Sequence, residues 1–236
     1  MTVLDVDVAL RTGAFTLEVR LSATPGVTVL FGPSGAGKST VLALVSGLAR
    51  PDRGRIALGD DVWLDRAAGV ERPVHLRKVA YVFQSLALFP HLTAVENTAY
   101  GMGREAPREA RAARARELLA RFHVGHLADR RPDTFSGGEA QRVALARAFA
   151  MAPRVVLMDE PFSALDHGLR RELLGVVTEI VKDLGVPTLF ITHHVGEAET
   201  IAERVVLLEK GRVTGVGGAD ILPERRATAD GGGRPP

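Results

Sequence analysis

The sequence predicts an α/β fold: a core with a mostly parallel sheet, an antiparallel β subdomain at the N-terminus, and a helical subdomain inserted into the core. Three observations lead to this prediction. Apolar and polar residues alternate over 3–10 and 14–23, as in half-buried strands. Strand-like and helical segments alternate after residue 153, which is typical of a parallel sheet buried on both faces. Between these parts, residues 87–153 combine helical spacing with many alanines and arginines.

The first part of the core divides into short elements. Residues 28–32 (TVLFG) form an apolar strand that runs into a glycine turn, and residues 39–49 (STVLALVSGLA) follow as a helix. Residues 54–64 (GRIALGDDVWL) predict two strands joined by a turn at 59–61. Residues 79–84 (VAYVFQ) predict a short strand that ends in a polar residue. These strands and this helix would build one half of the core.

The second part begins with the helical insert. Residues 93–102 and 107–124 have helical spacing and predict two of its helices. Residues 154–160 (RVVLMDE) and 187–192 (PTLFIT) predict buried strands, with a helix at 169–184 between them. The core is therefore expected to resume after the insert.

We expect one domain over residues 1–222, with the helical subdomain inserted at about 87–153. Residues 223–236 are polar and rich in Gly and Pro, so we expect a disordered tail. The N-terminal segment is acidic early and lacks a long apolar run, which argues against a signal peptide. No stretch approaches the roughly 18 consecutive apolar residues of a membrane span, so another chain would have to supply any spans.

Composition narrows the classes of function. Hydrophobic residues make up 46% of the chain and charged residues 25%, as in ordinary globular proteins. The formal charge is only +2, and acidic residues are interspersed among the arginines, which argues against a nucleic-acid partner. The chain has no cysteine, so disulfides and thiolate metal sites are excluded.

A phosphate-binding motif lies between a predicted strand and a predicted helix. The stretch GPSGAGKS fits G-x-x-x-x-G-K-[ST], the P-loop, and places the core in the P-loop NTPase (RecA-like) class. Lys38 would reach the β- and γ-phosphate oxygens of ATP, and Ser39 would ligate Mg²⁺. The alternative is a glycine-rich turn with a chance lysine, which this context disfavours. The nucleotide-binding residues are expected to be Gly32, Pro33, Ser34, Gly35, Ala36, Gly37, Lys38, Ser39 and Thr40.

Two acids end the buried strand at 154–160. Asp159 and Glu160 lie where that strand ends, the edge at which ligands bind in such sheets. Asp159 would hold Mg²⁺ directly or through water, and Glu160 would orient and deprotonate the attacking water. The alternative is a pair of helix-capping acids. With the P-loop present, the pair favours ATP hydrolysis over transfer to another substrate.

Together these motifs resemble the ATPase subunits of ABC transporters, over nearly the whole chain to about residue 222. The resemblance implies ATP and Mg²⁺ as cofactors. It also implies roles for further residues. Gln84 in VFQSLALFP would couple the γ-phosphate and the metal to the membrane partner, and His193 in ITHH would be the switch histidine. Asp166, also a candidate helix cap, would end the D-loop, which matches Ser163-Ala164-Leu165-Asp166.

The family signature, commonly LSGGQ, is matched by Phe135-Ser136-Gly137-Gly138-Glu139. In the family, two copies pair head to tail, and the signature of one copy closes over the ATP in the P-loop of the other. Hydrogen bonds from this segment to the γ-phosphate would contribute about 1.5–3 kcal/mol each. The alternative for SGG is a helix cap with tightly packed glycines. ATP is therefore expected to hold a homodimer together.

Three residues depart from the common family pattern: Phe135, Glu139 and His194. Phe135 replaces leucine and is expected to keep its packing role. Glu139 replaces glutamine, but it lies in the first turn of a helix, where a negative charge is favoured by about 0.3–1 kcal/mol. We draw nothing from His194, which stands where aspartate is frequent. None of these changes removes the expected catalytic residues.

The resemblance also implies an aromatic residue that stacks on adenine. Phe15, on an early strand, is the candidate, with a core or strand-face phenylalanine as the alternative. The remaining histidines lack the spacing of metal ligands and are expected to be surface or capping residues; they are His75, His91, His123, His126 and His167.

The segment QSLALFPHLTAVEN resembles importer ATPases, where this region docks a short helix of the permease. Apolar side chains for such a groove would come from Leu86, Leu88, Phe89 and Leu92, although core packing explains some of them equally well. The motifs look most like those of molybdate and tungstate importers, and a substrate-binding protein would act indirectly. The ATPase would lie on the cytoplasmic face of the cell membrane. The chain ends before the extra C-terminal β-domain of many such relatives, so we expect no feedback through one.

Other functions remain open at this point. The alternatives are the ATPase of a sulfate, phosphate, iron or polyamine importer, an ABC-type ATPase in translation or DNA repair, and a module that senses ATP without hydrolysing it. Non-transport members usually have tandem cassettes or long coiled-coil inserts, and the interval between Lys38 and Ser136 leaves room only for a compact insert. Glu160 with His193 argues against the sensor.

Overall fold

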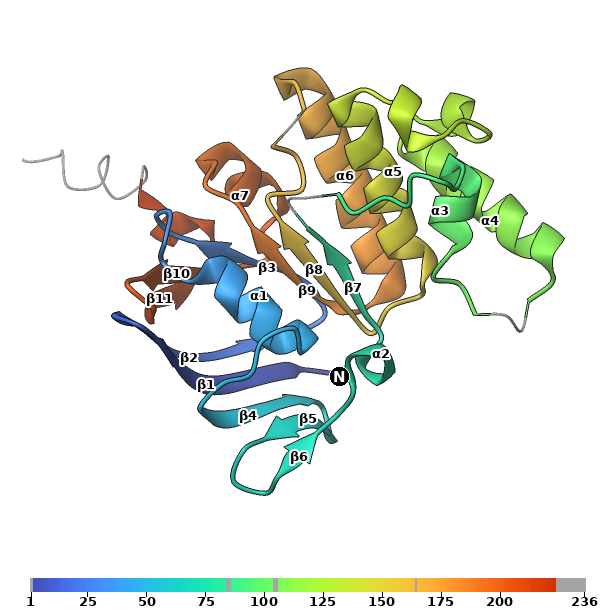
Figure 1. Cartoon of the computed structure of the whole chain (residues 1–236). Helices are drawn as coiled ribbons and strands as arrows, with labels where there is room; N and C mark the ends of the chain where they lie inside the picture. The colour runs from blue at the N-terminus through green and yellow to red at the C-terminus, as the bar shows by residue number, and fades with distance from the viewer. Residues whose placement is uncertain (1, 84–85, 104–105, 164, 224–236) are drawn as a thin grey trace, which may run out of the picture.

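The computed structural model describes residues 2–83, 86–103, 106–163 and 165–223. These residues form the predicted α/β fold around one eleven-stranded sheet (Figure 1). The strand order is β6-β5-β4-β1-β2-β11-β10-β3-β9-β8-β7. The sheet therefore runs without interruption from an antiparallel part to a parallel part.

The antiparallel part contains the early strands, as the alternating pattern predicts. Its strands are β1 Leu4–Thr12, β2 Phe15–Ala23, β4 Arg53–Leu58, β5 Asp61–Asp65 and β6 Val70–Glu71. β1 pairs with both β2 and β4, and every second residue at the start of β1 is buried. One face of these strands thus packs inward and the other faces solvent.

The parallel part carries the strands that precede the predicted functional residues. It consists of β3 Gly26–Phe31, β7 Val79–Val82, β8 Val155–Asp159, β9 Pro187–Ile191 and β10 Arg204–Glu209. β11, Arg212–Gly217, returns antiparallel to β10 and meets β2 at one residue pair. No element is predicted from the sequence at residues 204–217, so this hairpin is a finding of the structure.

Seven α-helices are described. They are α1 Lys38–Ser46, α2 Val74–Arg77, α3 Ala94–Ala99, α4 Arg108–Arg121, α5 Gly137–Ala150, α6 His167–Leu184 and α7 Val195–Ile201. Short 3-10 helices lie at Gly125–Leu127, Pro132–Thr134 and Ala219–Ile221. The start of α6 follows from its cap: the Asp166 side chain accepts a hydrogen bond from the Leu169 N–H at 3.0 Å.

The parallel strands are covered on both faces, as their continuous apolar runs predict. On β8, Val155 and Leu157 pack with α1 and the antiparallel strands, whereas Val156 and Met158 pack with the cluster that contains α5 and α6. Figure 1 shows α1 on one side of these strands and α5 with α6 on the other. The ends of the strands, rather than their faces, are therefore left for a ligand.

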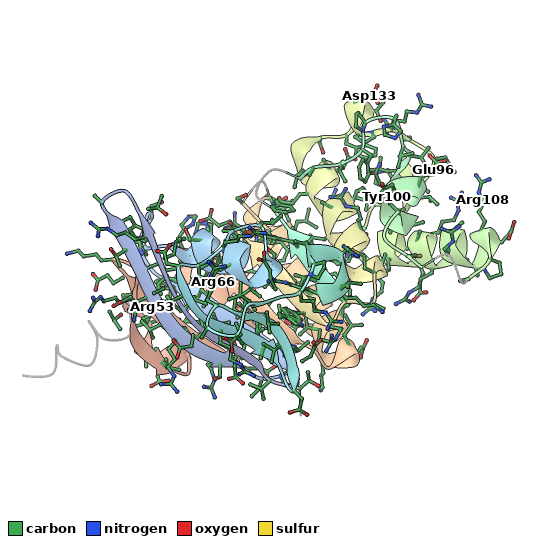
Figure 2. The ribbon with its side chains drawn as sticks, turned by 60° about the horizontal axis from the view of Figure 1, so that its bottom comes forward. Arg53, Arg66, Glu96, Tyr100, Arg108 and Asp133 are labelled. Carbon is green, nitrogen blue, oxygen red and sulfur yellow. The ribbon has the colours of Figure 1, made fainter. Side chains whose placement is uncertain are left out.

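Between β7 and β8, the described residues form helices and no strand. Figure 2 shows Tyr100 on this helical part and Arg53 on the antiparallel part, at opposite ends of the molecule. The boundaries of the helical subdomain, about 87–153, remain a prediction, and the expected disordered tail lies outside the described residues apart from Pro223. Within the described ranges, no helix combines the length and apolarity needed to cross a bilayer.

Candidate nucleotide-binding site

The predicted P-loop forms the turn from β3 into α1. Gly35 and Gly37 adopt left-handed φ angles of 77° and 100°, which glycine adopts at no steric cost. A Cβ on Gly37 would lie 2.7 Å from Leu17 Cδ1 and 3.0 Å from Phe15 Cζ. Among the described residues, no side chain caps the N-terminus of α1. Its first N–H groups therefore remain available to bind an anion at the positive end of the helix dipole.

Lys38 lies under this loop and supplies its positive charge. Its Nζ donates to the carbonyl oxygens of Gly32 at 2.7 Å and Pro33 at 2.9 Å. Burial lowers the pKa of Lys38, and the negative charges of Glu160 and Asp159 oppose that shift. The ammonium group is thus held next to the loop N–H groups, where a phosphate would bind.

Ser39 and Asp159 meet although they are 120 residues apart in the chain, because α1 starts beside the end of β8. Burial raises the pKa of Asp159, and its hydrogen bond with the Ser39 side chain counteracts the shift. A hydroxyl and a carboxylate are oxygen ligands of the type that Mg²⁺ prefers. These two residues fit the predicted metal site, while Gln84, the third predicted contributor, lies outside the described residues.

Glu160 and His193 also come together, at the ends of β8 and β9. The His193 Nδ1 lies 3.0 Å from Glu160 Oε1, and the Glu160 N–H donates to the Ile191 carbonyl at 3.1 Å. Glu160 has a φ of 48°, a left-handed conformation that is uncommon for a residue with a side chain. The backbone therefore turns at Glu160 and directs its carboxylate toward the histidine.

These groups line one cavity of about 620 Å³. Its lining is Phe15, Ser34, Gly35, Gly37, Lys38, Ser39, Thr40, Asp159, Glu160, Ile191 and His193. Phe15, at the start of β2, is half-buried at the rim of the P-loop, so its predicted place beside the nucleotide is compatible with the geometry. Ala36 is buried, and its N–H donates to the Pro33 carbonyl at 3.2 Å. Ala36 and Pro33 therefore stabilise the turn of the P-loop. Ile191 was not predicted, because it cannot be distinguished from a core residue of an apolar strand.

Gly211, in the turn between β10 and β11, joins the P-loop to β2. Its N–H donates to the Ala36 carbonyl at 3.0 Å, and its carbonyl accepts from the Glu18 N–H at 2.7 Å. A Cβ on Gly211 would clash with the Thr16 carbonyl oxygen, and the φ of 78° is left-handed. This bridge was also missed in the sequence, because it depends on the unpredicted β10–β11 hairpin.

The signature segment lies apart from this cavity. None of Ser136, Gly137, Gly138 and Glu139 is among the described residues that line it. Ser136 caps α5: its N–H and Oγ donate to Glu139 Oε2 at 2.7 and 2.8 Å, and the Glu139 N–H donates back to Ser136 Oγ at 3.3 Å. This capping box accounts for the acid at position 139. The helix-cap alternative is therefore present, but it leaves Gly137 exposed, and a Cβ added there would meet no described atom within 4 Å.

A larger groove, of about 790 Å³, lies over the antiparallel strands. Three of its four arginines form ion pairs: Arg20 with Asp7 at 3.8 Å, Arg53 with Glu18 at 2.7 Å and Arg55 with Asp65 at 3.8 Å. Figure 2 shows Arg53 and Arg66 on this part of the molecule. Among the described residues, no group of three or more His, Asp or Glu side chains forms a metal site. The chemistry therefore concentrates in the smaller cavity.

Comparison with known protein families gives a match for residues 18–163, to the ABC transporter model. Among curated proteins, the molybdenum import ATP-binding protein ModC of Brucella abortus (strain 2308) is 42% identical over 234 residues. This match covers 99% of the chain and 65% of the relative. ModC of Rhizobium meliloti (strain 1021) is 41% identical over 237 residues, covering 98% of the chain and 65% of that protein. The chain thus spans less than two thirds of the length of these relatives.

Solved structures give a similar result. A bacterial ABC transporter cassette described as dimeric matches with a TM-score of 0.79 at 28% identity, covering 92% of this chain and 98% of that one. The same cassette, in a dimeric post-hydrolysis state bound to ADP and Pi, matches with a TM-score of 0.77 at 29% identity and the same coverage.

Proposed function

The chain belongs to the ABC transporter family, and on this basis we propose that it is the ATP-hydrolysing subunit of an importer, acting on a separate membrane permease. One observation carries the proposal: the P-loop, the Ser39–Asp159 pair and the Glu160–His193 pair all line the same cavity. A phosphate-binding loop, a metal site and an acid–base pair are the parts that hydrolysis of a nucleoside triphosphate requires.

The cavity would bind ATP in an extended pose. The first N–H groups of α1 and the Lys38 ammonium would hold the β- and γ-phosphates, and Phe15 would stack on adenine. Ser39, Asp159 and Gln84 would hold Mg²⁺, which, when bound, offsets the negative charge of the phosphate oxygens. The site thus combines charge neutralisation with a fixed position for the γ-phosphate.

Hydrolysis would depend on Glu160. Its carboxylate would orient the attacking water and accept its proton, while the hydrogen bond to His193 Nδ1 holds the carboxylate in place at 3.0 Å. With both ring nitrogens protonated, His193 would donate through Nδ1 to Glu160 and through Nε2 to a γ-phosphate oxygen. Both side chains lie at the carboxyl ends of neighbouring strands, so the rigid sheet fixes their separation.

A second copy of the chain would complete the site. Because Ser136, Gly137 and Gly138 do not line their own cavity, we assign them to the γ-phosphate in the partner's P-loop, with Asp166 near the same interface. The exposed Gly137 and the N-terminus of α5 leave room for such a contact. The dimeric assembly of the similar cassette supports this arrangement.

The permease would dock at the segment before α3. Phe89 packs against Tyr100 at a ring-centroid distance of 4.3 Å with the rings tilted by 40°, and Tyr100 is 63% exposed. Asn97 holds this loop: its Oδ1 accepts from the Phe89 N–H at 2.8 Å and its Nδ2 donates to the Leu92 carbonyl at 3.0 Å. Leu88 packs against the core, so Leu86, Phe89 and Leu92 remain for the groove.

The cargo is proposed to be molybdate or a related oxyanion, supplied by a substrate-binding protein, because the curated relatives are molybdenum import proteins. The protein would then act at the cytoplasmic face of the membrane and without nucleic acid. Reconstitution with the permease tests the cargo: ATPase activity should rise with binding protein loaded with molybdate. A rise with sulfate, phosphate, iron or polyamine instead would reassign the importer.

The hydrolytic function is tested by Glu160→Gln. We expect phosphate release to be lost and an ATP-dependent dimer to accumulate on a sizing column. The matched control is Glu172→Gln, because Glu172 also pairs with a histidine, His123, at 3.2 Å but lies outside the cavity. Unchanged hydrolysis in Glu160→Gln, with no dimer, would refute the proposal.

A further inference from the structure

Next to the signature segment, a histidine contacts the acid that replaces the common glutamine. The Nε2 of His126, on the 3-10 helix Gly125–Leu127, lies 3.3 Å from Oε1 of Glu139. Oε2 of the same carboxylate accepts both hydrogen bonds from Ser136. The two oxygens of Glu139 are therefore divided between the histidine and the serine.

This arrangement matters because Ser136 is the proposed donor to the γ-phosphate of a partner. A carboxylate 2.8 Å from Ser136 Oγ adds negative charge where a triphosphate must approach. The pKa of Glu139 is lowered to about 2, first by the backbone hydrogen bond of Ser136 and then by its hydroxyl, with His126 contributing. Glu139 therefore stays ionised near neutral pH, and its negative charge continues to oppose the approach of the triphosphate.

We propose that His126 is a positioning residue for the signature segment. Its imidazolium offsets the charge of the Glu139 carboxylate and holds that carboxylate through Oε1 when the Ser136 hydroxyl turns from Oε2 to the γ-phosphate, so that ATP-driven closure of the dimer strengthens as pH falls through the range in which histidines titrate. This inference rests on the proposed function. Imidazoles change charge between about pH 5 and 8. The Glu139 carboxylate, whose pKa is lowered to about 2, keeps its charge throughout that range.

The other charged groups near Glu139 interact with other residues, so the offset of its charge is assigned to His126. Asp129, one turn beyond it, is bound by Arg116 at 2.8 Å. Arg130 donates to the Thr134 carbonyl at 3.2 Å. Arg142 lies one turn along α5 and acts on Asp166, whose pKa is lowered first by the backbone hydrogen bond from Leu169 and, to a smaller extent, by the Arg142 charge. Asp133 on Pro132–Thr134 is exposed. Among the described residues, His126 is the basic side chain that contacts Glu139.

The test measures the ATP concentration that gives half-maximal dimer at pH 6 and pH 8, by sedimentation of the full chain in the Glu160→Gln background. Exposed ion pairs contribute modestly, so His126→Gln should weaken the dimer about two- to five-fold at pH 6 and leave it nearly unchanged at pH 8. His126→Arg, which stays charged, should restore tight closure at both pH values. Glu139→Gln, which keeps the cap but not the charge, should abolish the effect of removing His126.

His123→Asn is the control, because it removes a similar His–Glu pair, at 3.2 Å, away from the signature. Asparagine tolerates the left-handed φ of 57° at this position. A dimer whose pH dependence is the same with and without His126 would overturn this inference alone. A failure of the parent to form an ATP-dependent dimer at either pH would overturn the proposed function, and this inference with it.

Discussion

Replacing Gly137 with alanine distinguishes the effect of this residue on folding stability from its effect on dimerisation. A Cβ at this position would meet no described atom within 4 Å, and the backbone angle there is not left-handed. Glycine-to-alanine changes at such sites stabilise a protein by about 0.4–1 kcal/mol, through the unfolded chain. For a protein of this size that corresponds to about 1–4 °C in melting temperature. Gly137→Ala should therefore melt at the same temperature or slightly higher.

The dimer should respond in the opposite direction. In the proposed assembly the backbone of Gly137 approaches the partner's γ-phosphate, and the added methyl group would hold it away. Losing one hydrogen bond to a charged group costs about 1.5–3 kcal/mol, which is roughly a 10- to 150-fold higher ATP concentration for half-maximal dimerisation. Both quantities can be measured on the same samples, by calorimetry without nucleotide and by sedimentation with ATP in the Glu160→Gln background.

Gly175→Ala is the matched control, since Gly175 is an exposed residue of α6 whose Cβ would also meet nothing within 4 Å. It should raise the melting temperature and leave the dimer unchanged. If Gly137→Ala dimerises at the parental ATP concentration, Gly137 does not approach a phosphate and the assignment of the signature is wrong. A large loss of thermal stability would instead show that Gly137 is required for packing.

Three further predictions concern the cavity and its support. Phe15→Ala should weaken ATP binding by about 1–3 kcal/mol, the range for base–aromatic stacking, and Phe15→Trp should retain the affinity, as measured by calorimetric titration. If the parent and Phe15→Ala bind ATP equally well, Phe15 has a structural role only. Arg77 is 1% exposed and donates to the carbonyls of Val45 at 2.8 Å and Leu44 at 3.2 Å at the end of α1. Arg77→Met should therefore lower the free energy of unfolding, measured in urea, by about 2–5 kcal/mol. The control Arg114→Met, at an exposed position, should change it by less than about 0.5 kcal/mol. Because burial raises the pKa of Asp159 above its ordinary value of 3.8, this acid favours the folded state at low pH and loses that contribution as pH rises through its raised pKa. Asp159→Asn should therefore increase thermal stability at pH 7 relative to the parent and abolish hydrolysis, with a stability gain that shrinks toward pH 4; a gain independent of pH would contradict this account.

The sequence was sufficient for the fold class, because its signals are local. Alternation over residues 3–10 and 14–23 predicted half-buried strands, and β1 and β2 confirm them. The stretch GPSGAGKS specifies a turn that only glycines can make before a helix, and φ angles of 77° and 100° at Gly35 and Gly37 match that expectation. The rule that ligands bind at the carboxyl ends of parallel strands predicted that Asp159 and Glu160 would lie beside the P-loop.

Contacts between segments that are distant in the sequence and meet only in the folded chain were not predictable. The bridge through Gly211 needs a hairpin formed by residues 204–217, whose apolar run resembles any buried segment. The His126–Glu139 contact joins two residues separated by several turns, and its 3.3 Å distance depends on how those turns pack. Histidine and glutamate at this spacing carry no periodic signal. The predicted roles of Gln84, Ser136 and Asp166 remain predictions, because they concern a nucleotide and a second molecule.

The Gly211 bridge has a consequence for the range of nucleotides that the protein can accept. Gly211 ties the strand of Phe15 to the phosphate loop through its N–H and its carbonyl, so the distance between the backbones of these two segments is set by main-chain hydrogen bonds. The cavity therefore holds its aromatic end and its phosphate end at a set separation. A ligand shorter or longer than this span has to forgo the contact at one of its two ends.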